Sequence, residues 1–261
     1  SLEPLHQLPQ GLHHRALVIG GGIAGMTAAL NLAEQGFPTI LVEREPQLGG
    51  LLLQHDTLTS GLDSRTLVRR LVEQVQSNPH IEVMTNSEVI KSIGFVGNFK
   101  TTVASRGDPT QRLIEHGATV VATGGREYRD SQYMLGQHPA VMTLSDLEKA
   151  FKSNDARLKQ ARRIVVIQCV GPWEKLPFYC SRVCCTVTMK NIRKLKEVNP
   201  SCQVVVLYKD IRTYGTREEL YTEARRLGAV FVRYSDDNPR VVEATGDTVE
   251  VAVTEPSLNE Q

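Results

Sequence analysis

Four of the five cysteines lie in one stretch in the second half of the chain, at Cys169, Cys180, Cys184 and Cys185. Thiolates bind zinc and iron–sulfur clusters, and paired thiols exchange with disulfides. The first residues lack the apolar stretch of a secretion signal, so a framework of disulfides is not expected. The cysteine stretch is therefore a candidate metal or redox site.

Several interpretations of this stretch stay open on the residues alone. Core packing suits the isolated Cys202 but explains four neighbouring cysteines poorly. Structural zinc usually takes its thiolates from C-x-x-C pairs, and this sequence contains none. A [4Fe–4S] cluster accepts four thiolates, and adjacent Cys184 and Cys185 can face one centre at a loop-to-helix junction, although not along a strand. We favour the cluster over zinc, core packing or a dithiol active site.

A second candidate site is the glycine-rich segment 20–25, which fits the pattern G-x-G-x-x-G between an apolar run and a helical pattern. Gly20 permits a tight turn, Gly22 lets the backbone approach a pyrophosphate, and Gly25 lets the helix pack closely on the strand. Glu43 ends the next apolar run, about 20 residues on, where a carboxylate accepts hydrogen bonds from a ribose hydroxyl. The alternative is a glycine-rich turn with an exposed glutamate. The context favours a dinucleotide site.

The elements that must position these residues form two strand–turn–helix–strand halves. The first half has expected strands at 16–20, 39–43, 81–84, 89–95, 99–103 and 118–122, and helices at 23–35 and 67–76. The second has expected strands at 164–168, 204–208 and 230–234, and helices at 144–153, with Ser145 as N-cap, 182–198 and 217–227. The pattern predicts an α/β fold with two Rossmann-like dinucleotide-binding folds. We expect a tail at 1–14 and domains at 15–126 and 143–261.

Length and charge bound the class of protein further. The 261 residues suit two domains, and 30 Lys and Arg against 29 Asp and Glu give a formal charge of +1. Such a balance predicts no general affinity for nucleic acid. The longest uncharged run, residues 16–30, is too short and too rich in glycine to span a membrane. We expect a cytoplasmic protein.

Glu43 and Arg44 are followed by Gly49 and Gly50, and later by the run A-T-G-G at 122–125. This combination resembles the FAD domain of the pyridine nucleotide–disulfide oxidoreductases, of which thioredoxin reductase is one type. In that type the second half binds NAD(P)H through its own glycine fingerprint, which the cysteine stretch replaces here. The resemblance implies FAD contacts at Gly20, Gly22, Ile23, Ala24, Gly25, Glu43, Arg44, Gly49, Gly50, Val89, Ala122, Thr123 and Gly124.

Segments 167–171, 179–186 and 207–215 look like the A subunit of heterodisulfide reductase, as do 41–46 and 96–99, and the match covers nearly the whole chain. In that family this subunit carries an FAD proposed to send one electron toward ferredoxin and one toward a disulfide-reducing subunit. The resemblance implies a [4Fe–4S] cluster on Cys169, Cys180, Cys184 and Cys185. It also implies that Lys190 lies against the reactive edge of the flavin, where a cation stabilises the reduced anion. On the residues alone, Lys190 is a solvated member of a basic helix.

The resemblance implies three partners: other subunits of a heterodisulfide reductase-like complex, an electron carrier such as ferredoxin, and a second copy of this chain. Two departures stand out. The ferredoxin-like segments with further cysteine runs are absent, and so is the C-terminal segment that closes the FAD domain. We therefore expect a truncated core. Two alternative functions are an NAD(P)H-dependent flavoprotein disulfide reductase and a non-catalytic scaffold subunit.

Overall fold

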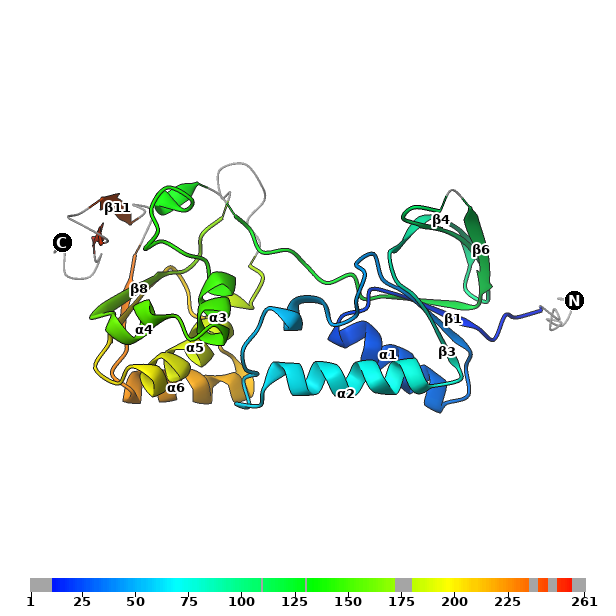
Figure 1. Cartoon of the computed structure of the whole chain (residues 1–261), viewed down its shortest axis with the longest axis horizontal. Helices are drawn as coiled ribbons and strands as arrows, with labels where there is room; N and C mark the ends of the chain where they lie inside the picture. Colours follow the sequence, from blue (N-terminus) through cyan, green and yellow to red (C-terminus); the bar gives the residue numbers. More distant parts are fainter. Residues whose placement is uncertain are drawn as a thin grey trace, which may run out of the picture. The chain divides into compact units, whose positions relative to one another are not determined.

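The chain folds into two compact units in this computed structural model (Figure 1). The structure describes residues 11–108, 110–129, 131–171, 180–234, 239–243 and 248–254. One unit comprises residues 1–53 and 63–125, and the other comprises 54–62 and 126–261. Segment 54–62 therefore packs with the second unit, although its neighbours along the chain belong to the first.

The first unit is built on a parallel sheet of four strands in the order β3-β2-β1-β7. Helices α1 (Ile23–Glu34) and α2 (Ser64–Ser77) pack against one face of this sheet and bury residues such as Met26 and Val75. The strands are β1 (Ala16–Ile19), β2 (Thr39–Val42), β3 (Ile81–Met84) and β7 (Ala118–Val121).

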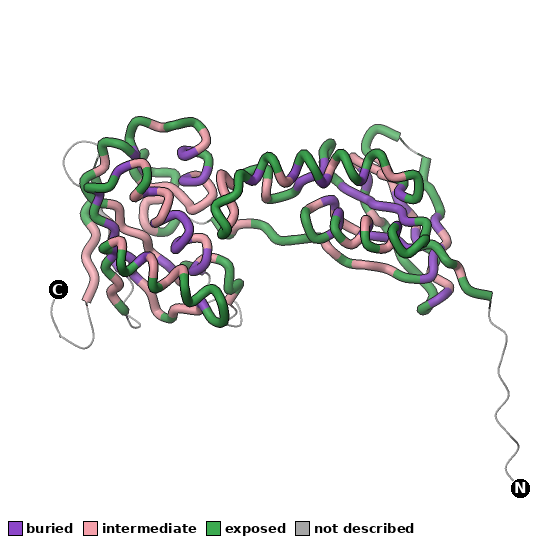
Figure 2. The backbone as a smooth tube through the Cα atoms, turned by 90° about the horizontal axis from the view of Figure 1, so that it is seen from below, coloured by how far each residue is buried: buried purple, intermediate pink, exposed green. Residues whose placement is uncertain are grey.

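An antiparallel sheet covers the other face, in the order β4-β5-β6. Its strands are β4 (Ser87–Phe95), β5 (Asn98–Ser105) and β6 (Gln111–His116). Val103 and Ile114 from this sheet pack against Leu17, Ile40 and Val42. Strands β1 and β2 are buried on both faces, which explains why they read as unbroken apolar runs (Figure 2).

The second unit contains a parallel sheet in the order β10-β9-β8, formed by β8 (Arg163–Ile167), β9 (Gln203–Tyr208) and β10 (Val230–Arg233). Helices α3, α4, α5 and α6 bury its apolar core, which includes Met189, Ile192 and Leu195. Their bounds are α3 (Leu144–Lys152), α4 (Ala156–Gln160), α5 (Cys184–Val198) and α6 (Glu218–Arg226). A further pair, β11 (Arg240–Glu243) and β12 (Val249–Ala252), is antiparallel.

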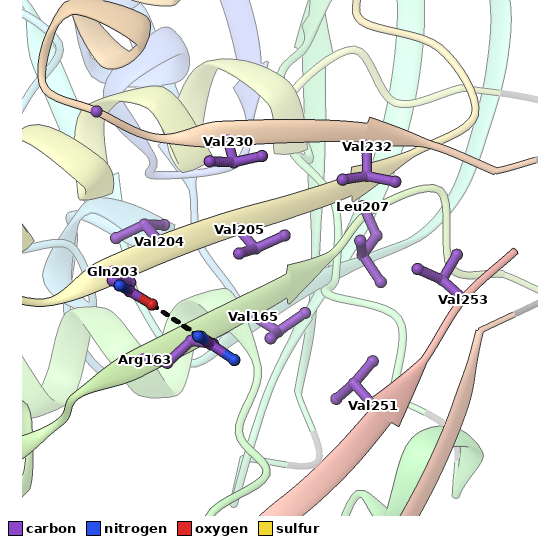
Figure 3. Close-up of a pocket in the computed structure, with 11 residues that line it drawn as sticks. Arg163, Val165, Gln203, Val204, Val205, Leu207, Val230, Val232, Val251 and Val253 are labelled. Carbon is purple, nitrogen blue, oxygen red and sulfur yellow. Dashed lines mark hydrogen bonds between the residues drawn. The ribbon is translucent and has the colours of Figure 1, made fainter. Parts of the chain in front are cut away.

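A hollow of about 490 Å³ lies over the β8–β9–β10 sheet, on a face rich in valine (Figure 3). Val165, Val205 and Val232 of the sheet line it together with Val251 of β12. Its polar rim is formed by Arg163, which donates a 2.8 Å hydrogen bond to the side chain of Gln203.

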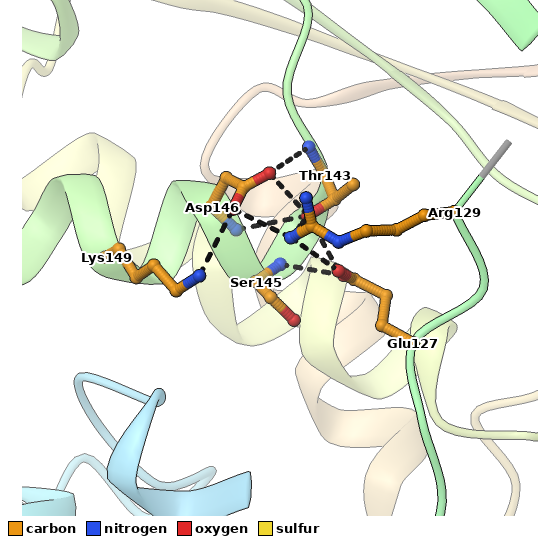
Figure 4. A network of polar contacts seen from close by, with 6 residues as sticks. All are labelled: Glu127, Arg129, Thr143, Ser145, Asp146 and Lys149. Atoms are coloured by element: carbon orange, nitrogen blue, oxygen red, sulfur yellow. Dashed lines mark hydrogen bonds and ion pairs between the residues drawn. The ribbon is translucent and has the colours of Figure 1, made fainter. Parts of the chain in front are cut away.

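The start of α3 corrects one detail of the sequence prediction. The N-cap is Thr143 rather than Ser145, because Thr143 and Asp146 form a capping box: the Asp146 N–H donates to the Thr143 hydroxyl at 3.2 Å (Figure 4). Arg129 extends the network with a 2.8 Å hydrogen bond to the Asp146 carboxylate. Burial opposes ionisation of Asp146, but the bonds from Arg129 and Thr143 outweigh it and bring its pKa to about 2.

The remaining elements follow the predicted order, and the predicted fold class is confirmed. Helix α2 begins one turn earlier than expected, at Ser64, because Asp63 caps it. Strand β6, helix α4 and the β11–β12 pair were not predicted. Three short helical turns complete the described chain: η1 (Gly50–Leu53), η2 (Gln132–Met134) and η3 (Gly215–Arg217). No described helix is both long and apolar enough to cross a membrane.

Candidate functional site

The turn between β1 and α1 has the backbone geometry of a dinucleotide site. Gly20 has a φ of 109°, and a Cβ at this position would lie 2.3 Å from the carbonyl oxygen of Ala122. A Cβ on Gly25 would lie 1.8 Å from the carbonyl oxygen of Gly20. In contrast, a Cβ on Gly22 would meet nothing within 4 Å. Two of the glycines are therefore required by packing, whereas the third leaves open space that a pyrophosphate can enter.

Helix α1 supplies the electrostatics of this turn. Its N-cap is Gly22, so no side chain caps the helix, and its first turn carries no acidic residue. Ile23 and Ala24 are exposed at this end. The N-terminal amides of a helix lack intrahelical partners and carry a partial positive charge, so they bind phosphate groups.

Glu43 closes the opposite side of the turn and is buried, so the alternative of an exposed glutamate is wrong. One of its oxygens accepts a 2.6 Å hydrogen bond from the backbone N–H of Gly21, and the other accepts a 2.8 Å bond from Glu45. An ionised carboxylate has about four acceptor sites. Capacity therefore remains for a ribose hydroxyl. Arg44 beside it is exposed and pairs with Glu45.

The second glycine pair lies against the first. The N–H of Gly49 donates to the carbonyl of Gly21 at 2.8 Å, and a Cβ on Gly50 would lie 3.0 Å from the Cα of Gly22. The end of β7 joins them, because the N–H of Ala122 donates to Ile19 at 2.8 Å and is followed by exposed Thr123 and Gly124.

Val89 lies apart from these backbone segments, in β4, where it is half-buried against the core formed with Leu17. The structure thus brings the two glycine segments together with the ends of β2 and β7, at one edge of the sheet. The contact of each with FAD stays a prediction.

The predicted thiols gather around the loop that follows β9. The sulfur atoms of Cys169 and Cys185 lie 3.8 and 3.9 Å from the carbonyl oxygen of Asp210. The backbone N–H of Arg212 donates to Cys185 at 3.5 Å. Cys184 and Cys185 stand at the start of α5, the kind of loop-to-helix junction where adjacent thiols can face one centre.

The two adjacent thiols polarise each other. The hydrogen bond between them lowers the pKa of Cys184 to about 6, with further help from the backbone N–H of Cys185 and from Ser181, although burial opposes this shift. The same hydrogen bond and burial raise the pKa of Cys185. Arg212 has a raised pKa because it binds Asp210 and lies near the thiol of Cys180. Cys184 is thus the nucleophilic member of the pair.

The donor chemistry suits a thiolate-bound metal group, because thiolates are its usual ligands and the sulfur atoms of Cys169 and Cys185 meet at one carbonyl oxygen. Residues 172–179, including Tyr179 of the predicted motif, lie between Cys169 and Cys180 outside the described residues. Within the described parts of the chain, no three side chains already stand as a metal-ligand set. The fit is therefore one of donor chemistry and convergence.

Lys190 is buried in α5, with 3% of its side chain exposed, so the alternative of a solvated lysine is wrong. Its ammonium group pairs with the carboxylate of Glu148 in α3, which is 1% exposed, and donates a 2.8 Å hydrogen bond to the carbonyl of Thr57. The other oxygen of Glu148 accepts from the N–H of Asp56 at 2.8 Å, and His55 lies 3.6 Å from the carboxylate. Segment 54–62 is thus held to α3 and α5 by polar contacts.

Glu148 was missed by the sequence reasoning, because nothing distinguishes it from the other acidic residues of an amphipathic helix. Burial alone would raise its pKa. The hydrogen bonds from His55, Lys190 and Asp56 outweigh burial and bring the pKa to about 2. The carboxylate is therefore ionised at neutral pH, and its buried charge is compensated.

These observations describe an α/β protein with the glycine turn typical of dinucleotide-binding folds, and the comparison with known families agrees with this fold. Residues 14–167 match the family model described as pyridine nucleotide-disulphide oxidoreductase. The chain belongs to this family and is an oxidoreductase.

The resemblance to the A subunit of heterodisulfide reductase is also confirmed. The chain is 28% identical to the A subunit of the H(2):CoB-CoM heterodisulfide,ferredoxin reductase of Methanothermobacter marburgensis, over 89% of this chain and 49% of the relative. It is 28% identical to the A subunit of the ferredoxin/F(420)H(2)-dependent CoB-CoM heterodisulfide reductase of Methanosarcina acetivorans, over 92% of this chain and 42% of the relative. The chain therefore spans about half the length of the curated relatives it matches.

Solved structures support the fold. Thioredoxin reductase from Lactococcus lactis superposes with a TM-score of 0.56 at 16% identity, covering 94% of this chain and 72% of that one. Thioredoxin reductase from T. acidophilum gives a TM-score of 0.53 at 13% identity, over 94% and 71% of the two chains. At this level of identity the likeness concerns the fold alone.

Proposed function

We propose that this chain is the flavin-binding core of an electron-transfer subunit in a heterodisulfide reductase-like complex. FAD would bind at the glycine turn 20–25, and a [4Fe–4S] cluster would bind Cys169, Cys180, Cys184 and Cys185. One observation carries the proposal. Around the connection between β8 and α5, where a second dinucleotide turn would lie, the chain carries four cysteines, and two of them, Cys169 and Cys185, meet at the carbonyl oxygen of Asp210. A nicotinamide dinucleotide would need its phosphates at this connection.

Three groups of the first unit would hold the FAD. The free amides at the start of α1 would bind its pyrophosphate, Gly22 would leave room for it, and Glu43 would accept a hydrogen bond from the ribose. Gly49 and Gly50 would line the same side. The bound flavin would supply exchange between two-electron and one-electron chemistry.

The thiols of the second unit would hold the cluster, which would supply a one-electron carrier. Cys184, with a pKa of about 6, is largely a thiolate at neutral pH and can bind metal without losing a proton first. Cys185 has a raised pKa and would release its proton on binding. The N–H of Arg212 would then donate to a charged sulfur.

Lys190 would stabilise the reduced flavin. Its burial beside Glu148 and Thr57 supports a role for a desolvated cation, because charges interact more strongly in a low-dielectric interior than in water. The carboxylate of Glu148 would moderate this effect. The partners in this proposal are the other subunits of the complex and a ferredoxin-type carrier, which agrees with the names of the relatives.

The test is the content of FAD, iron, acid-labile sulfide and zinc per chain after anaerobic purification and reconstitution. We expect one FAD with about four irons and four sulfides. Replacing Cys184 and Cys185 by Ser should remove the iron and sulfide and retain the FAD. Cys202→Ser is the matched control, because Cys202 is a buried thiol in the hydrophobic core of the second unit.

Other results of the same assay would support different functions. Zinc without sulfide would sink the cluster and leave a flavoprotein with a zinc site. Rapid reduction of the flavin by NADH would favour the disulfide reductase. Absence of both flavin and metal would favour the scaffold.

A further inference from the structure

The side chain of Gln168 lies directly against one of the cysteines. Gln168 follows β8, is 2% exposed, and has its side-chain oxygen 3.4 Å from the sulfur of Cys185, which donates to it as a thiol. The backbone of Gln168 is fixed on both sides. Its N–H donates to the carbonyl of Leu207 at 2.8 Å, and its carbonyl accepts a 2.6 Å bond from the hydroxyl of buried Tyr234. The amide is therefore held in place beside the thiol.

The same amide has a donor group with no partner. The Nε2 atom of Gln168 is buried and makes no hydrogen bond within the described residues. Leaving a buried donor unpaired is unfavourable, and such groups are rare in native proteins. A buried, unpaired amide in contact with a cysteine points to a second state in which this donor is used.

Metal binding creates that state. A thiol must lose its proton to become a ligand, so the single S–H proton of Cys185, which lies within reach of both Cys184 and the Gln168 oxygen, is lost on binding. The remaining thiolate would face a carbonyl oxygen, which is unfavourable. Rotation of the amide by about 180° exchanges its oxygen and nitrogen with no change in volume, and places an N–H donor on the sulfur. The rotation also gives the unpaired Nε2 group of Gln168 an acceptor.

We propose that Gln168 donates a hydrogen bond to the thiolate of Cys185 when Cys185 ligates the cluster, and that this bond raises the cluster's reduction potential. The inference rests on the proposed function, because it concerns the cluster-bound form. Gln168 would be a positioning residue for electron transfer. A donor to a sulfur ligand stabilises the more negative, reduced state, which makes the cluster easier to reduce.

The test is a potentiometric titration of the reconstituted full chain, followed by electron paramagnetic resonance of the reduced cluster. Gln168→Met keeps the length of the side chain and Gln168→Leu shortens it; both remove the donor without adding a charge. Each should shift the ratio of reduced to oxidised cluster about ten-fold toward oxidised, which is ~59 mV for a one-electron couple. Asn191→Leu is the control, because Asn191 is an equally buried amide on α5 with no hydrogen-bond partner in the part of the chain that the structure describes.

A second measurement tests the inference without variants, in case the Gln168 variants fail to fold. In wild-type protein labelled with ¹⁵N in the glutamine side chains, pulsed resonance should detect a nitrogen coupled to the reduced cluster. If both Gln168 variants keep the cluster potential of the wild-type protein, or if the wild-type cluster shows no coupling to a glutamine nitrogen, the inference is overturned. The proposed function then stays intact. Wild-type protein that takes up no iron and sulfide would overturn both.

Discussion

Removing one partner of the buried pair of Lys190 and Glu148 should strongly destabilise the second unit. Among the described residues, Lys190→Met would leave the carboxylate of Glu148, which is 1% exposed, with His55 and the N–H of Asp56 as partners. Removing one partner of a buried ion pair costs about 3–5 kcal/mol. The pKa of Glu148, lowered to about 2 despite burial, shows the same dependence of the carboxylate on its partners His55, Lys190 and Asp56.

The measurement is urea unfolding followed by far-ultraviolet circular dichroism. Lys190→Met should lower the free energy of unfolding by about 3–5 kcal/mol, whereas Glu148→Leu combined with Lys190→Met should recover most of the loss, because an apolar pair can replace a buried ion pair at little cost. Lys149→Met, which changes an exposed lysine 3.4 Å from Asp146, should cost less than about 1 kcal/mol. A loss below about 1 kcal/mol for Lys190→Met would refute the reasoning.

The pH dependence gives an independent check. Because the folded pKa of Glu148 lies below its unfolded value, its contribution is fully present above pH 4.5 and is lost as the pH falls toward 2. The wild-type protein should therefore lose stability in this window more steeply than the double variant. Parallel curves for the two proteins would contradict the assigned role of the carboxylate.

Three further predictions concern the other sites. Gly25→Ala should lower the melting temperature, because its Cβ would lie 1.8 Å from a carbonyl oxygen. Gly22→Ala should leave the melting temperature nearly unchanged and reduce the FAD content. Equal melting temperatures for the two variants would contradict this contrast. In metal-free protein at pH 7.5, iodoacetamide should modify Cys184 before Cys185, because the pKa of Cys184 is about 6 and that of Cys185 is raised. Mass spectrometry of the modified peptides gives the order, and the reverse order would refute the assignment. Thr143→Ala should cost about 1 kcal/mol of stability in urea unfolding through loss of the α3 cap, and Ser145→Ala should cost less.

The sequence predicted the dinucleotide turn well because its chemistry is local. The spacing of Gly20, Gly22 and Gly25 follows from one strand, one turn and one helix, and Glu43 follows from the next strand. The strands expected at 16–20 and 39–43 were likewise found as β1 and β2. Such signals depend on neighbours along the chain, which a sequence pattern contains.

Contacts between distant segments could not be predicted in the same way. Glu148 and Thr57 meet Lys190 only because segment 54–62 packs against α3 and α5, and no periodicity encodes that packing. The amide of Gln168 likewise reaches Cys185 through the fold. The N-cap of α3 was misplaced because Thr143 and Ser145 are both good caps, and the choice depends on the bond to Asp146.

The most direct test of the account is an anaerobic reductive titration of the reconstituted chain with dithionite, with flavin absorbance and electron paramagnetic resonance recorded together. If one chain carries both FAD and a cluster, it should accept about three electrons, two at the flavin and one at the cluster. The variant with Cys184 and Cys185 replaced by Ser should accept about two. An uptake of two electrons by the wild-type protein, with no signal from a reduced cluster, would contradict the central claim.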